Sequence, residues 1–266
     1  MKKLIGVECL FYGIGIAGIG VQQLQYLSVR PVLLPPWPAW VHTGVLGALL
    51  TGSILIIGGI MIAIRKKARM VSLVLGGLFL ALFILFHVPY LLFINQYSPT
   101  NLGLWTDPLK ELALSGGAFV IAGLFKDRDA EKSSLFVWLE KLIPVGRIFF
   151  SITMIAFGID HFLYTDFVAT LVPAWIPGHT FWTYFGGVAL IASGLAIIFK
   201  IKHTLAAQLL AVMLFVWFIV LHIPRAIADP YQGYGNEITS VFEALAFSGI
   251  GLAIAFGADR KTALHW

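Results

Sequence analysis

The sequence predicts an all-α, polytopic membrane protein with eight transmembrane helices arranged as two parallel four-helix repeats. Hydrophobic residues make up 59% of the 266 residues, charged residues make up 12%, and the mean hydropathy is +0.90. A water-soluble protein of this size needs a more highly charged surface, so this composition is typical of a chain that crosses a membrane repeatedly. His87 and His222 each end an apolar run, and a proline follows each of them two residues later. This recurrence indicates an internal duplication.

The first repeat contains four apolar stretches, at residues 4–27, 41–64, 70–94 and 109–125. The first three reach the length of about 20 residues that a helix needs to cross the hydrocarbon core. The fourth is shorter, which predicts a local kink or little tilt. The first stretch begins after two lysines and imitates a signal peptide. We interpret it as a membrane helix, because it matches the first stretch of the second repeat and lacks a convincing cleavage site.

The second repeat contains four further apolar stretches, at residues 144–167, 181–200, 204–224 and 238–257. Glycines in both repeats are predicted to let helices approach closely. They include Gly13, Gly15, Gly18, Gly20, Gly186, Gly187 and Gly194. A mixed-charge segment at residues 126–143 separates the first repeat (1–125) from the second (144–266). We expect this segment to be a solvated and inert cytoplasmic linker.

The basic residues predict the orientation of the chain in the membrane. With eight crossings, all but three of the 18 lysines and arginines fall on one side, and the exceptions are Arg30, Lys110 and Arg225. Because basic residues collect on the cytoplasmic side, both termini are predicted to be cytoplasmic, in a multi-pass protein of the cytoplasmic (inner) membrane. Each repeat has an even number of crossings, so the two repeats share one orientation and are related by an axis along the membrane normal.

Two further features limit the partners of the chain. The formal net charge is +5, but the basic residues lie in short runs between apolar stretches, where they signal topology and not nucleic-acid binding. The lipid bilayer is therefore the expected partner. Cys9 is the single cysteine, which excludes an internal disulfide and a two-cysteine redox motif. The loops on the non-cytoplasmic side are rich in proline, tryptophan and tyrosine, as expected of segments that lie along the membrane surface.

The candidate site residues gather at the non-cytoplasmic ends of the helices of the second repeat. Ionisable groups at the end of a membrane-length apolar run are costly unless paired, so they mark a functional site. We predict catalytic roles for His161 and His222. The predicted ligand-binding residues are Asp160, Trp175, His179, Trp182, Arg225, Asn236, Glu237 and Glu243. The first repeat has Gln22 and Gln23 in place of Asp160 and His161, and Tyr90 in place of Arg225, so it is interpreted as a simplified copy.

Each of these residues has a purely structural alternative. His222 could bond a backbone carbonyl that Pro224 frees, and Arg225 could form an ion pair with Asp229 or Glu237. Asp160 and His161 are neighbours on one helix, so at most one of them is expected to face inward. A metal site formed by His161, His179 and His222 would suit imidazole ligands, but no characteristic spacing supports it. Haem ligation by the pair His87 and His222 is the remaining alternative.

The second half, from Arg147 to Phe256, resembles the DoxX-like family of four-helix membrane proteins. The resemblance rests on four phrases: residues 157–162, residues 172–179, residues 221–225, and residues 236–237 leading to residues 245–249. The first half resembles the same unit more weakly. The resemblance implies a four-helix fold, and some members of that family are linked to membrane redox complexes, including a quinone-linked subunit of a thiosulfate oxidoreductase. Others are linked to oxidative-stress defence.

The sequence and the resemblance together favour a redox-linked membrane subunit that binds a quinone, or a similar amphipathic small molecule, in the second repeat. His222 or His161 would donate protons, Arg225 or Glu237 would orient the ligand, and Trp175, Trp182, Tyr184 and Trp217 would hold the ring. The sequence has no electron carrier of its own, so an electron-donating protein partner is required. Two other functions remain open: a small-molecule transporter or permease, and a membrane scaffold or chaperone without a ligand.

Overall fold

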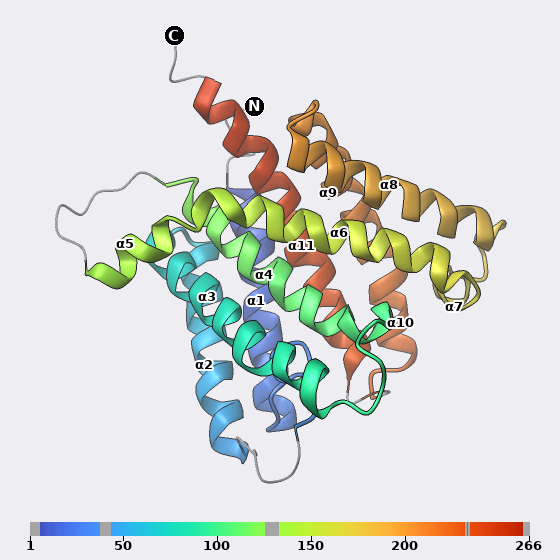
Figure 1. Ribbon diagram of the computed structural model, residues 1–266, viewed down its shortest axis with the longest axis horizontal. Helices are drawn as coiled ribbons and strands as arrows, with labels where there is room; N and C mark the ends of the chain where they lie inside the picture. Colours follow the sequence, from blue (N-terminus) through green and yellow to red (C-terminus); the bar gives the residue numbers. More distant parts are fainter. Residues whose placement is uncertain (1–5, 38–43, 126–132, 232, 234, 263–266) are drawn as a thin grey trace.

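The chain is folded almost entirely into helices (Figure 1). The computed structural model describes residues 6–37, 44–125, 133–231, 233 and 235–262, and these residues contain no strand. Seven of the described helical segments are long and apolar enough to cross a membrane. Four of them are single helices: α1 (Val7–Tyr26), α2 (Gly44–Ala63), α6 (Ile143–Leu163) and α8 (His179–Phe199). The other three are Ala68–Ile94, which begins with α3 (Ala68–Leu82); His203–Ala228, which begins with α9 (His203–Trp217); and Asn236–Gly257, which lies within α11 (Asn236–Thr262). The predictions of an all-α class and of membrane-spanning helices are confirmed.

The predicted fourth stretch forms α4 (Thr106–Ala122), a helix of 17 residues. At a rise of about 1.5 Å per residue it is about 26 Å long, slightly less than the hydrocarbon core. A 3₁₀ turn at Leu102–Trp105 leads directly into α4 and lengthens the helical segment. Nearly every residue of α4 from Pro108 onward is buried, so the helix lies inside the bundle and faces little lipid.

Three short helices connect the long ones: α5 (Ser134–Glu140), α7 (Thr165–Leu171) and α10 (Ile223–Ala228). The helix α5 lies in the segment that was predicted to be an inert solvated linker. Leu139 of α5 is 4% exposed and packs in a hydrophobic cluster with Leu73 and Phe119. Glu140 accepts hydrogen bonds from Arg69 of α3. The later part of the linker is therefore packed against the bundle, and residues 126–132 of it lie outside the described residues.

The long helices form a closed ring of neighbours. In ring order these are α1, α2, α3, α4, α6, α8, α9 and α11, and α11 packs again on α1. The helices α4 and α11 also contact each other across the ring. Each half therefore packs its last helix on the first helix of the other half, α4 on α6 and α11 on α1. The two halves share one interlocked core and do not form two separate four-helix bundles.

Close helix packing depends on glycines in both halves. A Cβ atom added at Gly59 of α2 would meet the backbone oxygen of Gly13 in α1, and one added at Gly194 of α8 would lie 2.8 Å from the backbone oxygen of Ser151 in α6. At the contact between α4 and α6, Gly116 and Gly146 face each other in the same way. These residues explain how the backbones approach so closely.

Both long histidine-bearing segments contain a π-helical turn that ends at the histidine. The turns are Phe83–His87 and Phe218–His222, each followed two residues later by a proline. Proline cannot donate a backbone hydrogen bond, and a π-helical turn is one way in which a helix accommodates the missing bond. The sequence around each histidine therefore sets the local widening of the helix that presents its ring.

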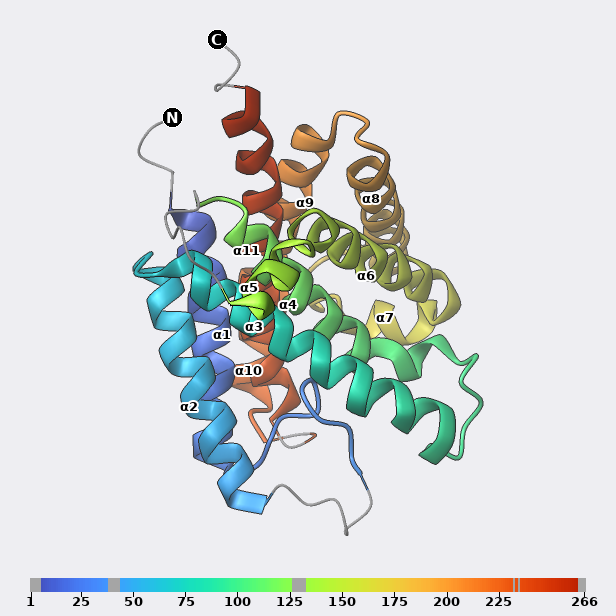
Figure 2. The same ribbon diagram turned by 60° about the vertical axis from the view of Figure 1, so that its left-hand side comes forward.

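The start of α1 and the end of α11 lie at the same end of the bundle, together with the turn between α8 and α9 (Figures 1 and 2). We call this the terminal end. The segment that follows α1 and the segment that precedes α11 lie at the other end, which we call the opposite end (Figure 2). The histidine-bearing π-helical turns fall in the part of their helices that leads to the opposite end.

Candidate functional site

A large cavity lies among the helices of the second half, toward the opposite end. Its volume is about 1030 Å³. It is walled by residues of α6, α7, α8, α9 and α11, by the π-helical turn that ends at His222, by the segment 172–176, and by residues 101–110, which include the first turn of α4. Most of the wall is aliphatic or aromatic. The cavity is large enough for a drug-sized or lipid-like molecule.

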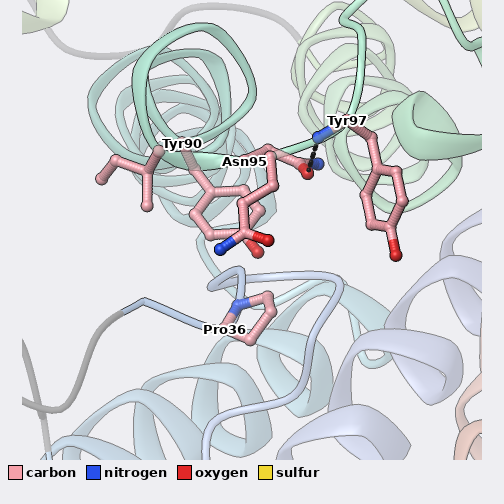
Figure 3. A pocket seen from close by; sticks show the side chains of 6 residues that line it. Pro36, Tyr90, Asn95 and Tyr97 are labelled. Atoms are coloured by element: carbon pink, nitrogen blue, oxygen red, sulfur yellow. Dashed lines mark hydrogen bonds between the residues drawn. The ribbon is translucent and has the colours of Figure 1, made fainter.

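A second, smaller pocket of about 250 Å³ lies at the opposite end of the first half (Figure 3). Pro36, Tyr90, Asn95 and Tyr97 are among its lining residues, and the backbone NH of Tyr97 donates to Asn95 Oδ1 at 3.0 Å. No charged residue is among the six that line it. We therefore consider the large cavity as the candidate site.

Six of the ten predicted site residues line the large cavity: Asp160, His161, Trp175, Trp182, His222 and Glu243. The other four do not line it: His179, Arg225, Asn236 and Glu237. Asp160 and His161 both line the cavity, so the expectation that at most one of them faces inward was wrong. The physical reason is that the cavity is wide at the end of α6, so it reaches side chains that differ by about 100° around the helix.

His161 is held by its own helix and by an aromatic partner. Its Nδ1 lies 2.7 Å from the backbone oxygen of Phe157, and a carbonyl oxygen only accepts, so Nδ1 donates this hydrogen bond. In the neutral ring Nε2 is then left as an acceptor. The ring stacks on Trp217, with 6.0 Å between the centroids. A Cβ atom on Gly186 would lie 3.0 Å from the ring of Trp217, so glycine at this position leaves room for the stack.

His222 presents a buried nitrogen without a partner. Its Nδ1 makes no hydrogen bond to any residue that the structure describes. The structural alternative, in which His222 bonds a carbonyl freed by Pro224, is therefore not seen at this nitrogen. Asp160 is in a similar state, because its buried Oδ1 also lacks a hydrogen-bond partner among the described residues. A buried polar atom without a partner costs free energy unless water or a ligand binds it, so both atoms are candidates to bind a ligand.

Lys110 brings a charge from the first half into the cavity wall. Its Nζ lies 2.9 Å from Glu243 Oε2 and 3.5 Å from Asp107 Oδ1. Sequence reasoning missed Lys110 because it treated this lysine only as a loop residue in the count of basic side chains. The signal was present: Lys110 lies in the shortest apolar stretch, and an ionisable residue there requires a partner.

Arg225 forms an ion pair outside the cavity wall. Its Nε and Nη2 donate to the two carboxylate oxygens of Glu237, at 3.0 Å and 2.6 Å. This two-pronged geometry is the strongest that an arginine and a carboxylate form. Of the two partners considered for Arg225, Glu237 makes this pair, which joins α10 to the start of α11. Neither residue lines the cavity, so the structure gives both a connecting position and not a ligand-contacting one.

The aromatic wall differs in one residue from the expectation. Trp175, Trp182 and Trp217 line the cavity, but Tyr184 does not. The ring of Tyr184 stacks instead on Phe162, with 5.5 Å between the centroids, and the side chain is 43% exposed. Tyr184 lies two residues after Trp182, so it points to another side of α8.

The arrangement suits an amphipathic ligand with polar groups at one end. Two imidazole rings face a large apolar space, together with the carboxyl groups of Asp160 and Glu243, each of which has an oxygen without a hydrogen-bond partner among the described residues. Among the described residues, no three side chains of histidine, cysteine, aspartate or glutamate lie close enough to hold a metal ion. His87, the other member of the proposed haem-ligating pair, is 1% exposed and its Nε2 already lies 3.3 Å from the backbone oxygen of Val32.

The comparison of the sequence with known protein families gave one match. A family described as a domain of unknown function (DUF8561) matches residues 150–241. The match runs from the first turns of α6 to the first turns of α11, so it includes most of the cavity wall but not Lys110 or Glu243. No curated protein and no solved structure is significantly similar to the chain.

Proposed function

We propose that the protein binds a quinone, or a similar amphipathic small molecule, in the second-half cavity and serves as a redox-linked membrane subunit. The observation that carries this proposal is the combination of a cavity of about 1030 Å³ with apolar walls and the unpartnered buried atoms Asp160 Oδ1 and His222 Nδ1. A ligand that offers both a polar ring and an apolar tail satisfies both kinds of surface.

The exposed side of the cavity supports entry from the membrane. Leu209, Val212 and Val216 of α9 line the cavity and are also strongly exposed, as is Phe185 of α8. These side chains would face lipid tails in a bilayer. An apolar molecule dissolved in the membrane would therefore reach the cavity between α8 and α9 without passing through water.

The ionisable groups of the cavity suit the proton chemistry of a quinone. Reduction of a quinone to a quinol adds two electrons and two protons. His161 Nε2 is the acceptor end of a ring whose other nitrogen is fixed, so a protonated His161 can deliver a proton from this atom to a ligand oxygen. Asp160 and His222 are the other groups that can carry a proton there. The electrons would come from a protein partner, because the chain holds no redox-active side-chain pair.

We infer further that the chain is a tandem DoxX-like protein with eight crossings. Matching contacts in the two halves support this inference. Ser115 of α4 donates to the backbone oxygen of Gly76, and Ser248 of α11 donates to that of Ala211. Tyr26 and Tyr164, which lie at the ends of corresponding helices, each donate to a segment that precedes the last helix of the other half. The π-helical turns that end at His87 and His222 supply a third match.

A small-molecule transporter is the second candidate, and the Lys110–Glu243 pair favours it. Transporters place ion pairs inside the membrane, at the base of a cavity that opens to one side. The pair lies in the cavity wall with side chains only 13% and 4% exposed. Uptake of labelled small molecules into liposomes would support this candidate, and quinone bound to the purified protein without such uptake would support the first.

Titration of purified protein with a short-chain quinone tests the proposed function. Replacing His222 with glutamine is expected to weaken quinone binding roughly tenfold or more while the melting temperature stays near that of the parent, because a hydrogen bond to the ligand is lost and the fold keeps its contacts. Thermal unfolding in detergent and quinone titration are measured on the same samples. The matched control is His203→Gln, at the terminal end of α9, which should change neither quantity.

Unchanged quinone binding by His222→Gln would contradict the proposed ligand site. If His222→Gln binds quinone as tightly as the parent while losing stability, His222 is a packing residue. Arg225→Ala provides the contrast, because it leaves Glu237 without its partner and is expected to lower stability by about 2 kcal/mol. Its exposed fraction of 32% keeps this loss below that of a fully buried pair.

Reporter fusions test the proposed orientation. With eight crossings, fusions after residue 130 and after residue 260 are both expected to report the cytoplasm, because most basic residues then share that side. The readout is a pair of reporters, one active only inside the cell and one only outside. An external signal at either point would overturn the repeat assignment.

A further inference from the structure

The loop that follows α1 folds into the first half as a plug. Val32 and Leu33 are each 1% exposed, and Arg30 is equally buried. Backbone NH groups of Leu33 and Leu34 donate to the carbonyl of Arg30, so the loop makes a tight turn inside the protein. The guanidinium of Arg30 lies over the ring of Tyr26, 4.8 Å from its centroid. We call residues 28–37 the plug loop.

The plug loop makes a polar contact with the histidine of the first half. The Nε2 atom of His87 lies 3.3 Å from the backbone oxygen of Val32 and 3.4 Å from Glu111 Oε2. Because a carbonyl oxygen can only accept, Nε2 carries the proton in this hydrogen bond. At the end of the loop, Trp37 packs edge-on against Phe86, with 6.0 Å between the centroids. The carbonyl group that His87 bonds therefore belongs to a buried residue with a branched aliphatic side chain, and Leu33 next to it is another.

The corresponding segment of the second half leaves its histidine uncovered. Tyr26 and Tyr164 are 138 positions apart, as are Trp37 and Trp175, so the plug loop corresponds to residues 166–175. In the second half this segment forms α7 and the turn after it, and it borders the cavity instead of filling it. Trp175 is 73% exposed, whereas its counterpart Trp37 is partly buried. His222 consequently lines an open cavity of about 1030 Å³.

We propose that the plug loop occupies in the first half the place that a ligand takes in the second half, so that the ligand presents to His222 a hydrogen-bond-accepting carbonyl oxygen beside branched aliphatic carbon. This inference rests on the proposed function and narrows it. An isoprenoid-substituted quinone has both features, because its ring carbonyl lies next to a chain of branched five-carbon units. A straight-chain fatty acid lacks the branched carbon, and a phosphate group offers no carbonyl oxygen.

Thiol labelling tests the plug without any ligand. In a Cys9→Ala background, His87→Cys and His222→Cys are treated with N-ethylmaleimide in detergent. The thiol at position 222 is expected to react at least about tenfold faster, because the thiol at position 87 becomes accessible only when the plug loop opens. Replacing Val32 and Leu33 with glycine should raise the rate at position 87 toward that at position 222. Equal rates at the two positions in the protein with the native plug loop, or a rate at position 87 that the glycine replacements leave unchanged, would overturn the inference.

A set of three probes tests the ligand chemistry. The probes are a benzoquinone with one isoprenoid unit, the same ring and chain without the two oxygens, and the quinone with a straight chain of equal carbon number. The first probe is expected to bind roughly tenfold more tightly than the second, the difference that one hydrogen bond makes. His222→Phe should remove this difference while keeping the affinity for the hydrocarbon. The straight-chain quinone should bind more weakly than the branched one.

The outcomes separate this inference from the proposed function. If the hydrocarbon and the quinone bind equally well, or if His222→Phe leaves the difference intact, the carbonyl assignment is wrong and an amphipathic ligand site remains. If none of the three probes binds, the quinone function itself is wrong, and the inference falls with it whatever the labelling shows. If the glycine variant of the plug loop fails to fold, the comparison of His87→Cys with His222→Cys in the parent still decides whether the plug exists.

Discussion

Replacing Lys110 with methionine is expected to lower the free energy of unfolding by about 3–5 kcal/mol, because it leaves a buried carboxylate without its cation. Lys110 Nζ lies 2.9 Å from Glu243 Oε2, and the two side chains are 13% and 4% exposed. Methionine retains the length of the side chain, so the lost packing is small. Asp107, which also lies near Lys110, would then repel Glu243 and add to the loss. Urea unfolding in detergent measures the effect.

A double variant separates the loss of the ion pair from the loss of side-chain packing at the site. Lys110→Met combined with Glu243→Leu removes both charges and is expected to recover most of the stability. The exchange Lys110→Arg keeps the charge and should cost much less than Lys110→Met. A loss in the double variant as large as the sum of the two single losses would mean that the residues do not interact. The same variants, titrated with quinone, would show whether the pair also acts on the ligand.

Replacing Gly116 with valine is expected to destabilise the protein by about 3 kcal/mol or more, because the added atoms would collide with the backbone of α6. A Cβ atom at Gly116 would meet the backbone oxygen of Gly146 and would lie 2.8 Å from the Cβ atom of Phe149. Neither the backbone nor a Cβ atom can turn aside as a flexible side chain can. The helices α4 and α6 would have to separate. The melting temperature and the yield of monodisperse protein are the measurements.

A glycine in a looser environment provides the control. A Cβ atom at Gly257, near the end of α11, would meet only the end of the Leu124 side chain, at 3.3 Å. Gly257→Ala is therefore expected to be neutral or slightly stabilising, because alanine favours the helical conformation. If Gly116→Val were tolerated as well as this control, the close contact between the two halves would not hold the fold together.

Two sets of contacts made by α4 hold the halves of the protein together. The contact between α4 and α6 joins the halves, and the pair Lys110–Glu243 joins α4 to α11. The start of α4 also forms part of the wall of the second-half cavity. A change that separates the halves should therefore disturb the cavity, even when it lies far from the histidines. Quinone titration of the stability variants tests this dependence.

The sequence by itself determined the long helices and their order. The apolar stretch predicted at 41–64 is α2 (Gly44–Ala63), and the stretch predicted at 181–200 is α8 (His179–Phe199). These features are local: in a membrane the backbone must satisfy its hydrogen bonds within each segment, so length and hydropathy suffice to find the helix. The prolines near His87 and His222 likewise mark local changes in the helix.

The sequence also indicated much of the candidate site, because charged and polar groups are rare in apolar segments. Asp160, His161, His222 and Glu243 were selected for this reason, and all four line the cavity. The same reasoning could not separate them from Arg225 and the three other predicted residues, which lie elsewhere. Residues at one membrane depth can face different directions, and depth was all that the order of the segments gave.

The tertiary structure alone decided which half contributes to which site. Lys110 belongs to the first half in sequence but lines the second-half cavity, because α4 packs on α6 and on α11. It also decided that the plug loop fills the first half while α7 borders an open cavity in the second. Both outcomes depend on contacts between segments far apart in the chain, such as the meeting of Gly116 with Gly146. Composition and spacing describe single segments, and the fit between two surfaces appears only when both are placed in space.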